Sequence, residues 1–197
     1  MEYNFFATIS RMKYIDRWAL MRNSRTENLS EHSLEVAMIA HALCTIGNVR
    51  YKKNLNADRA ALIGLYHDSS EIITGDMPTP VKYYNPEIKD AYKQVEKIAN
   101  YKLLEKLPKD LRPIYEEIFK TDNSADDKYM RKLVKAADKI SAYIKCIEEE
   151  KSGNTEFSKA KESIGNILDK LSGEYPEVKD FVEEFLPPFG KTLDELN

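Results

Sequence analysis

His67 and Asp68 are adjacent in the sequence, and Glu71 follows them in the apolar segment AALIGLYHDSSEII. Residues three and four positions apart share one face of a helix, so a helix over this segment brings the three side chains together. Burial of imidazole and carboxylate groups among Leu, Ile and Ala needs compensation. A divalent cation such as zinc, manganese, iron or cobalt provides it, because these ions accept mixed nitrogen and oxygen ligands. A buried hydrogen-bond network that caps a neighbouring helix is the alternative.

The chain has two other histidines, His32 and His41, and both fall in one predicted helix. Nine residues at about 100° each amount to about 900°, which places the two histidines on opposite faces. One metal ion therefore cannot take both. His32 follows Glu31 near the start of the helix, where it is either a metal ligand or an exposed or capping histidine. We interpret His41 as an ordinary core or surface histidine.

Asp138 lies in a later predicted helix, at the border of an apolar stripe and close to several lysines. The stripe consists of Leu133, Ala137, Ile140, Ser141 and Ile144. From spacing alone, a solvated carboxylate beside lysines is the simpler interpretation of Asp138.

Arg17 and Trp18 are the first candidates for phosphate recognition. A guanidinium binds two phosphate oxygens at once, and the neighbouring indole offers an aromatic face to a sugar or base. Arg22, Arg25 and Lys82 are further basic candidates, although charged residues of this kind usually face solvent. The segment DMPTP, residues 76–80, predicts a rigid extended turn, because each proline fixes its own backbone and restricts the residue before it.

The composition limits the function classes. The chain has 197 residues with a formal net charge of −3, so no general basic field attracts a nucleic-acid polymer or an anionic membrane. The apolar stretches are short, and the first residues do not resemble a signal peptide. Cys44 and Cys146 are expected to be buried thiols. We expect a cytoplasmic protein.

The chain has only seven glycines and eight prolines, and this low content favours helices over a turn-rich β-fold. Asn28 with Glu31 predicts a capping box, and Gly47 predicts the end of the helix that it starts. We expect one all-α helical domain over residues 1–197, with a core at about 4–186 and a loosely held polar tail at 187–197. Helices are predicted over residues 3–15, 28–47, 56–75, 85–107, 110–120, 126–150, 155–171 and 176–186, and the helix at 56–75 is predicted to be the most buried.

Taken together, His32, the pair His67-Asp68 and Asp138 resemble the H…HD…D signature of the HD-domain metal-dependent phosphohydrolases. The segments RWALMRNSRTENLSEHSLEVAMIAHAL, LYHDSSEIITGDMPTPVKYYN and VKAADKISAYIKCIEE are similar to the bacterial 5′-deoxynucleotidases of the YfbR type. The resemblance extends from about residue 4 to the Pro187-Pro188 segment.

This resemblance implies an all-α HD domain, usually a homodimer, that removes the 5′-phosphate from deoxyribonucleoside monophosphates with one divalent transition metal such as cobalt, manganese or zinc. The metal ligands it implies are His32, His67, Asp68 and Asp138, three of which (His32, Asp68 and Asp138) also adjoin the substrate. It makes Glu71 the catalytic carboxylate, with Arg17 orienting the phosphate. The implied substrate contacts are Trp18 at the sugar and the turn of Asp76, Met77, Pro78 and Thr79.

The mechanism expected from these assignments is in-line attack on phosphorus by a metal-bound hydroxide, assisted by Arg17 and Glu71. Trp18 and the turn after residue 75 are expected to crowd the sugar, so that a ribose 2′-hydroxyl fits poorly. The alternatives are another HD hydrolase, acting on deoxynucleoside triphosphates, alarmones or cyclic nucleotides, and a non-catalytic nucleotide-binding module. A binuclear phosphodiesterase centre generally needs more histidines than this chain supplies.

Overall fold

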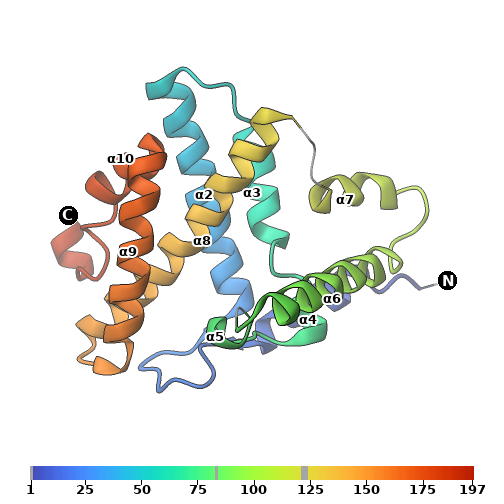
Figure 1. Cartoon of the computed structure of the whole chain (residues 1–197), viewed down its shortest axis with the longest axis horizontal. Helices are drawn as coiled ribbons and strands as arrows, with labels where there is room; N and C mark the ends of the chain where they lie inside the picture. Colours follow the sequence, from blue (N-terminus) through green and yellow to red (C-terminus); the bar gives the residue numbers. More distant parts are fainter. Residues whose placement is uncertain (1, 83, 121–123) are drawn as a thin grey trace.

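Helices α2 (Leu29–Tyr51) and α8 (Ala125–Lys151) cross at the centre of the computed structural model (Figure 1). The structure describes residues 2–82, 84–120 and 124–197, except for the side chains of Thr79 and Pro80. Both long helices bury an apolar face against each other, with Val36, Leu43, Leu133 and Ile140 inaccessible to solvent. This crossing forms the core and carries part of the site described below.

Side-chain caps fix where the long helices begin, as the sequence predicts. Asn28 accepts hydrogen bonds from the amides of Ser30 and Glu31, and the Glu31 carboxylate accepts one from the Asn28 amide, which completes the capping box. Ser124 accepts from the Asp127 amide at the start of α8. The predicted helix at 126–150 is therefore confirmed to within one residue at each end.

Shorter elements surround the crossing. Helix α3 (Ala57–Tyr66) lies along α2, and α9 (Ser158–Glu174) and α10 (Pro176–Glu184) cover the other side, where the carboxyl terminus lies (Figure 1). The remaining elements are α1 (Phe5–Ile9), α4 (Glu71–Thr74), α5 (Thr79–Lys82), α6 (Pro86–Leu104), α7 (Arg112–Phe119), the two-residue strands β1 (Asp16–Arg17) and β2 (Glu27–Asn28), and 3₁₀ turns at Ser10–Tyr14, Thr155–Phe157 and Leu193–Leu196. The fold is all-α, as predicted, and the antiparallel ladder of β1 and β2 closes the loop between them.

A smaller apolar cluster joins the amino-terminal helix to α6 and to the end of α3. Phe5 is buried with Leu103 and Leu107, and its ring lies 5.1 Å from Tyr115 and 6.4 Å from Tyr66, centroid to centroid. Tyr66 is the last residue of α3. This cluster therefore fixes the chain immediately before His67.

The prediction that Gly47 ends its helix is wrong. Helix α2 continues to Tyr51, and Lys52 in a left-handed conformation (φ 53°) ends it. Gly47 serves packing instead, because a Cβ there would lie 2.8 Å from Oε1 of Glu177. A glycine in a helical pattern can mark a close approach as well as a terminus.

The helix predicted over 56–75 is also wrong in two respects. It divides into α3 and α4 with a turn between them. It is not the most buried helix, because three of the ten residues of α3 are buried, against eleven of the 23 residues of α2. The 76–80 segment is extended only in part, since α5 begins at Thr79. The tail at 187–197, predicted to be loosely held, is partly packed, because Phe189 contacts the core formed around α2 and α8.

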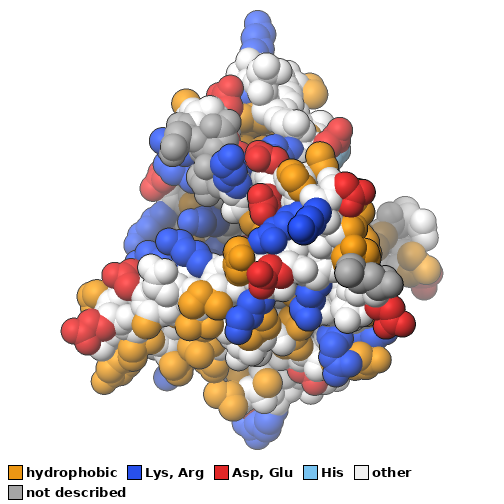
Figure 2. All heavy atoms as spheres, turned by 90° about the vertical axis from the view of Figure 1, so that its right-hand side faces the viewer, with side chains coloured by type: hydrophobic (Ala, Val, Ile, Leu, Met, Phe, Trp, Pro, Cys, Tyr) orange, Lys and Arg blue, Asp and Glu red, His pale blue; other side chains and the backbone are white. Residues whose placement is uncertain are grey.

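The face in Figure 2 carries both signs of charge, with Lys and Arg interspersed among Asp and Glu. This pattern agrees with the small net charge of −3. Among the described residues, no helix has the length and the apolar run that a bilayer crossing requires.

Candidate metal centre

His67 and Asp68 lie in the turn that joins α3 to α4, and not within one continuous helix as the sequence predicts. Helix α3 approaches α2 so closely at Gly64 that a Cβ there would lie 2.8 Å from the Cα of Ala37. The carbonyl of Gly64 accepts a hydrogen bond from Nδ1 of His67 over 2.7 Å. A close helix contact therefore fixes both the place and the ring orientation of His67.

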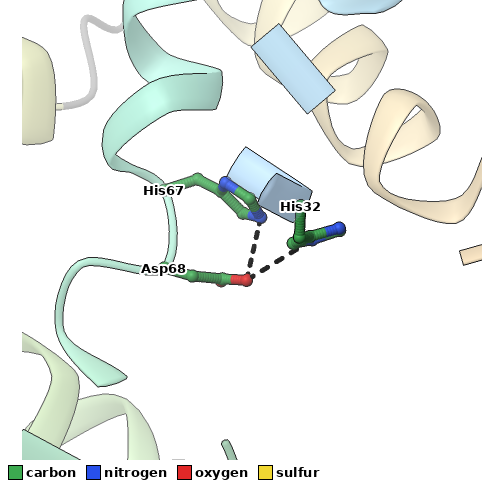
Figure 3. A group of neighbouring side chains, drawn as sticks. All are labelled: His32, His67 and Asp68. Carbon is green, nitrogen blue, oxygen red and sulfur yellow. Dashed lines mark ion pairs between the residues drawn. The ribbon is translucent and has the colours of Figure 1, made fainter. Parts of the chain in front are cut away.

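His32, in the first turn of α2, points toward this pair (Figure 3). Oδ2 of Asp68 lies 3.0 Å from Nε2 of His67 and 3.6 Å from Nε2 of His32. One ligand atom from each of the three residues falls within 4.8 Å of the others. These side chains, the three-residue cluster, come from two separate elements that the fold brings together.

The cluster fits a divalent metal ion by the chemistry of its donors. Nε2 of His32 and Nε2 of His67 are both buried, and neither has a hydrogen-bond partner. Buried polar atoms without partners are rare in folded proteins and call for a specific explanation. Because Nδ1 of His67 donates to Gly64, Nε2 is the ring nitrogen that can bind a metal ion in place of a proton. Two imidazole nitrogens beside a carboxylate oxygen form a suitable ligand set for a transition metal.

Asp138, on α8, lies beside the same nitrogen of His32 that faces Asp68. Its Oδ1 lies 3.2 Å from Nε2 of His32, while its Oδ2 pairs with Nζ of Lys139 at 3.0 Å. The described structure places Asp138 beside the three-residue cluster but outside the group of atoms within 4.8 Å. One oxygen of Asp138 thus faces the site and the other faces a lysine.

The charges in the site act strongly on one another. Burial disfavours the charged form of His67, but the Asp68 carboxylate outweighs burial and raises the pKa of His67 to about 9. Burial likewise opposes ionisation of Asp68, and the charge of His67 overcomes it and lowers the pKa of Asp68 to about 2. Burial, followed by the charge of Arg17, lowers the pKa of His32. His32 is therefore held as a neutral imidazole, the form that binds metals.

Glu71 is the first residue of α4 and is only 6% exposed. Its Oε2 is buried and has no hydrogen-bond partner. Burial, and then the negative charges of Asp68 and Asp76, raise the pKa of Glu71 to about 8. A carboxyl group with such a pKa exchanges protons near neutral pH, as a general acid or base requires.

Arg17 lies on β1, directly opposite Glu27 on β2. Its Nη1 is 2.6 Å from Oε2 of Glu27, and both side chains are largely buried. Burial disfavours the charge of Arg17, but Glu27 and the carboxylates of Asp138, Asp68 and Asp76 outweigh burial and raise the pKa of Arg17. The short ladder thus presents a buried cation to the candidate metal centre.

Trp18 follows with φ 58°, a left-handed conformation that is unusual for a bulky residue. Its amide donates a hydrogen bond to Oδ2 of Asp76 over 3.2 Å, and its indole lies against Phe157 at 5.3 Å. The indole Nε1 is buried without a hydrogen-bond partner. Strained backbone and unpaired donors concentrate at functional sites.

The turn after α4 contains the other predicted substrate contacts. The Asp76 carboxylate accepts the hydrogen bond from the Trp18 amide. Met77 is half-buried and Pro78 is exposed. The side chain of Thr79 lies outside the described part of the chain.

The other basic candidates from the sequence form ion pairs with residues outside the three-residue cluster. Arg22 pairs with Glu156 and Arg25 with Glu31, both with exposed guanidinium groups. Lys82 pairs with Glu96 at 2.8 Å. His41 faces Asp58 at 3.8 Å and does not belong to the cluster, in agreement with the helical spacing.

Sequence reasoning missed the residues that hold the cluster in place. Glu27 anchors Arg17, Gly64 orients His67, and Ser141 contacts Nδ1 of His32 at 3.0 Å. A signal existed for Ser141, since a hydroxyl in an otherwise apolar stripe needs a buried partner. Gly64 precedes His67 by one helical turn, and a glycine inside a helix often marks a close packing contact.

Comparisons with known proteins identify the family of this chain. A family model described as 5′-deoxynucleotidase YfbR-like matches residues 4–189. A 5′-deoxynucleotidase of Erwinia tasmaniensis is 50% identical over 98% of this chain and 96% of its own length, and one of Yersinia pseudotuberculosis is 48% identical over the same shares.

Solved structures of HD-domain proteins share the fold. A phosphohydrolase of Listeria innocua has a TM-score of 0.79 at 24% identity, covering 94% of this chain and 88% of its own. The HD phosphohydrolase of cyanophage S-2L has a TM-score of 0.53 at 22% identity, covering 75% and 73%. Because the family model matches residues 4–189 and these relatives match 98% of the chain, the chain belongs to the YfbR-like 5′-deoxynucleotidase family.

Proposed function

We propose that this chain is a metal-dependent 5′-deoxynucleotidase that hydrolyses deoxyribonucleoside 5′-monophosphates to deoxyribonucleosides and phosphate. One observation carries the proposal beyond family membership. Three buried atoms without hydrogen-bond partners, Nε2 of His32, Nε2 of His67 and Oε2 of Glu71, belong to one site that also contains Arg17. Two of them suit a metal ion, and the third suits proton transfer.

His32, His67 and Asp68 would hold the metal ion, with Asp138 as a fourth ligand. A bound divalent ion would supply Lewis acidity to a phosphoryl oxygen and lower the pKa of water at the site. Cobalt, manganese and zinc all suit two imidazoles and two carboxylates. The cyanophage S-2L phosphohydrolase, described as bound to dA and one catalytic Zn²⁺ ion, supports a single ion of this type.

Arg17 is the proposed phosphate ligand. Its ion pair with Glu27 engages Nη1, and the fork geometry of a guanidinium leaves further donors for phosphate oxygens. Because the side chain is held before substrate binds, little rotamer entropy is lost when it contacts the phosphate. Arg17 then stabilises the charge that develops on the equatorial oxygens.

Glu71 is the proposed proton carrier. As water attacks phosphorus and the bond to the 5′-oxygen breaks, one proton must leave the water and one must reach the 5′-oxygen. The pKa of about 8 that burial and the charges of Asp68 and Asp76 give Glu71 lets one carboxyl group accept the first proton and donate the second. A metal ion bound at the three-residue cluster would lower that pKa toward neutrality.

Trp18 and the Asp76, Met77, Pro78 and Thr79 turn are proposed to select deoxyribose. The hydrogen bond between Trp18 and Asp76 joins the two segments, so the sugar would bind against a preformed wall. A 2′-hydroxyl enclosed there without a partner costs about 1–3 kcal/mol.

A substrate panel tests the function. We expect the metal-loaded protein to release phosphate from dAMP and other deoxynucleoside monophosphates, and to release it more slowly from AMP. Triphosphate or pyrophosphate release from dGTP with no phosphate release from dAMP would assign another HD hydrolase activity. Nucleotide binding with no hydrolysis under any divalent metal would assign a non-catalytic module.

We also propose that residues 1–197 act as one domain, in a cytoplasmic homodimer. The family model matches residues 4–189 as one unit, and Cys44 and Cys146 are buried free thiols, the state that a reducing compartment maintains. Exposed Leu34 and Met38 on α2 offer apolar surface to a second copy. Light scattering should give about twice the chain mass of 22.8 kDa, and a mass equal to one chain would refute the dimer.

A further inference from the structure

Both nitrogens of His32 face residues of α8. Nε2 lies 3.2 Å from Oδ1 of Asp138, and Nδ1 lies 3.0 Å from Oγ of Ser141. Asp138 and Ser141 are three residues apart, so consecutive turns of one helix reach the two sides of one imidazole ring. His32 and Ser141 are both fully buried.

The two histidines of the three-residue cluster differ in how their tautomers are set. Nδ1 of His67 contacts a backbone carbonyl, which can only accept, so Nδ1 carries a proton and Nε2 is the nitrogen that a metal ion would take. Nδ1 of His32 contacts a hydroxyl, which can either donate or accept. Ser141 alone therefore does not decide which nitrogen of His32 carries the proton.

The carboxylates beside Nε2 of His32 favour the Nε2–H tautomer, which cannot bind a metal ion through that nitrogen. A proton on Nε2 of His32 would face the carboxylates of Asp138 and Asp68, at 3.2 and 3.6 Å. That proton would occupy the lone pair that a metal ion needs. A metal-binding His32 thus requires a group that makes the Ser141 hydroxyl an acceptor toward Nδ1.

Glu35 can make the Ser141 hydroxyl an acceptor toward Nδ1 of His32. The Ser141 hydroxyl donates to Oε2 of Glu35 over 2.5 Å. A hydroxyl has one proton, so once it is given to a carboxylate, Ser141 can only accept from Nδ1–H of His32. Glu35 lies one turn after His32 on α2 and lines a cavity of about 100 Å³ with Glu27, Lys145 and Glu148 among its walls.

We propose that Ser141 and Glu35 are positioning residues that hold His32 in its Nδ1–H tautomer and so keep Nε2 available as the metal-binding nitrogen. Outer hydrogen bonds of this kind fix the tautomer of metal-binding histidines and raise their basicity. Here the carboxylate acts through a serine hydroxyl and not directly on the ring. This inference rests on the proposed function of the cluster as a metal centre.

The test is the affinity of the metal-stripped full chain for Co²⁺, measured by calorimetric titration at pH 8.5. Burial raises the pKa of Glu35 to about 7, so this pH keeps it ionised. We expect Ser141→Ala and Glu35→Met each to weaken Co²⁺ binding by about 10–100-fold, the usual effect of losing such a partner. Glu35→Gln keeps an acceptor oxygen and should recover much of the affinity.

Glu148→Met is the matched control, since Glu148 lines the same cavity and the substitution removes the same charge. We expect it to change the affinity by less than about threefold. Circular dichroism of each metal-free variant checks that the helices remain. If Glu148→Met weakens Co²⁺ binding as much as Glu35→Met does, the loss of any nearby negative charge explains the effect, and the proposal fails.

The double variant Glu35→Met/Ser141→Ala gives the sharpest result. If Glu35 acts through Ser141, it should bind Co²⁺ no more weakly than Ser141→Ala alone. If the two substitutions weaken Co²⁺ binding independently, so that their fold-changes multiply, Glu35 does not act through Ser141 and the proposal is contradicted.

The tautomer can also be read directly. Long-range ¹H–¹⁵N correlation spectra of the metal-free chain resolve its three histidines, and His41→Gln removes the one outside the site. We expect His32 to carry its proton on Nδ1 in the wild type and on Nε2 in Glu35→Met. An unchanged tautomer would overturn the proposal. Wild-type protein that binds no Co²⁺ would instead refute the metal centre, while the tautomer measurement would still decide the role of Glu35.

Discussion

The amide of Trp18 donates a hydrogen bond to Oδ2 of Asp76 over 3.2 Å, and this bond joins the loop after β1 to the turn after α4. The two residues are 58 positions apart in the chain. Trp18 holds a left-handed backbone conformation at φ 58°, which costs free energy unless its surroundings impose it. The Asp76 carboxylate holds the amide side of Trp18 from across the site, while the side chain of Asn23 and the amide of Met21 donate to the Trp18 carbonyl.

Replacing Asp76 with alanine should therefore reduce sugar discrimination. A hydrogen bond to a charged group contributes about 1.5–3 kcal/mol, and its loss lets Trp18 relax away from the sugar. We expect the ratio of kcat/KM for dAMP over AMP to fall by about tenfold or more. Asp58→Ala is the control, because the Asp58 side chain is 95% exposed and pairs with His41, outside the cluster. An unchanged ratio in Asp76→Ala would place sugar discrimination elsewhere in the site.

Replacing Glu71 with glutamine should separate catalysis from metal binding. Glutamine keeps the shape of the side chain but cannot carry a proton between water and the 5′-oxygen, so kcat should fall by about 10²–10⁴-fold. Co²⁺ affinity should stay within a few-fold of wild type, because the three-residue cluster is intact. Glu162→Gln, on the exposed face of α9, should leave both quantities unchanged. Substantial activity in Glu71→Gln would remove Glu71 from the mechanism.

Glu149 should make the stability of the chain depend on acid pH. It is 2% exposed and accepts hydrogen bonds from the Ser24 amide at 2.8 Å and from Asn154, beside its ion pair with Lys145. Burial opposes its ionisation, but Lys145 and the Ser24 amide outweigh burial and lower the pKa of Glu149 from 4.5 to about 2.

A lowered folded-state pKa stabilises the fold above the unfolded-state value of 4.5, and this stabilisation is lost as the pH falls toward 2. Urea unfolding should find Glu149→Gln less stable than wild type by about 3 kcal/mol at pH 7, with the gap shrinking by pH 3. Glu150→Gln, on the exposed neighbour that pairs with Lys161, should show a much smaller gap. A gap as large at pH 3 as at pH 7 would contradict the lowered pKa.

Local signals in the sequence predicted much of this fold. Asn28, Asn85 and Ser124 are side-chain caps, and a cap depends only on residues within one helical turn, so each helix start is readable from the sequence. The spacing of His32 and His41 likewise depends only on helix geometry, and the structure separates them as expected.

Features that depend on other segments were not predictable in this way. Gly47 suggests a helix end, but its role depends on Glu177, 130 residues later. The turn at His67 requires Tyr66 to be held by Phe5 and Tyr115. Two-residue strands carry no periodic signal, so the β1–β2 ladder that presents Arg17 could not be predicted.

Phosphate release from deoxynucleoside monophosphates should require one metal ion, held at His32, His67 and Asp68. The most direct test of this requirement is a titration of the chelator-stripped chain with Co²⁺, followed by phosphate release from dAMP and by bound metal per chain. We expect activity to be absent without metal and to reach its maximum at about one ion per chain. His67→Ala should neither bind the ion tightly nor recover activity. Full phosphate release by the stripped chain, or by His67→Ala, would contradict the account.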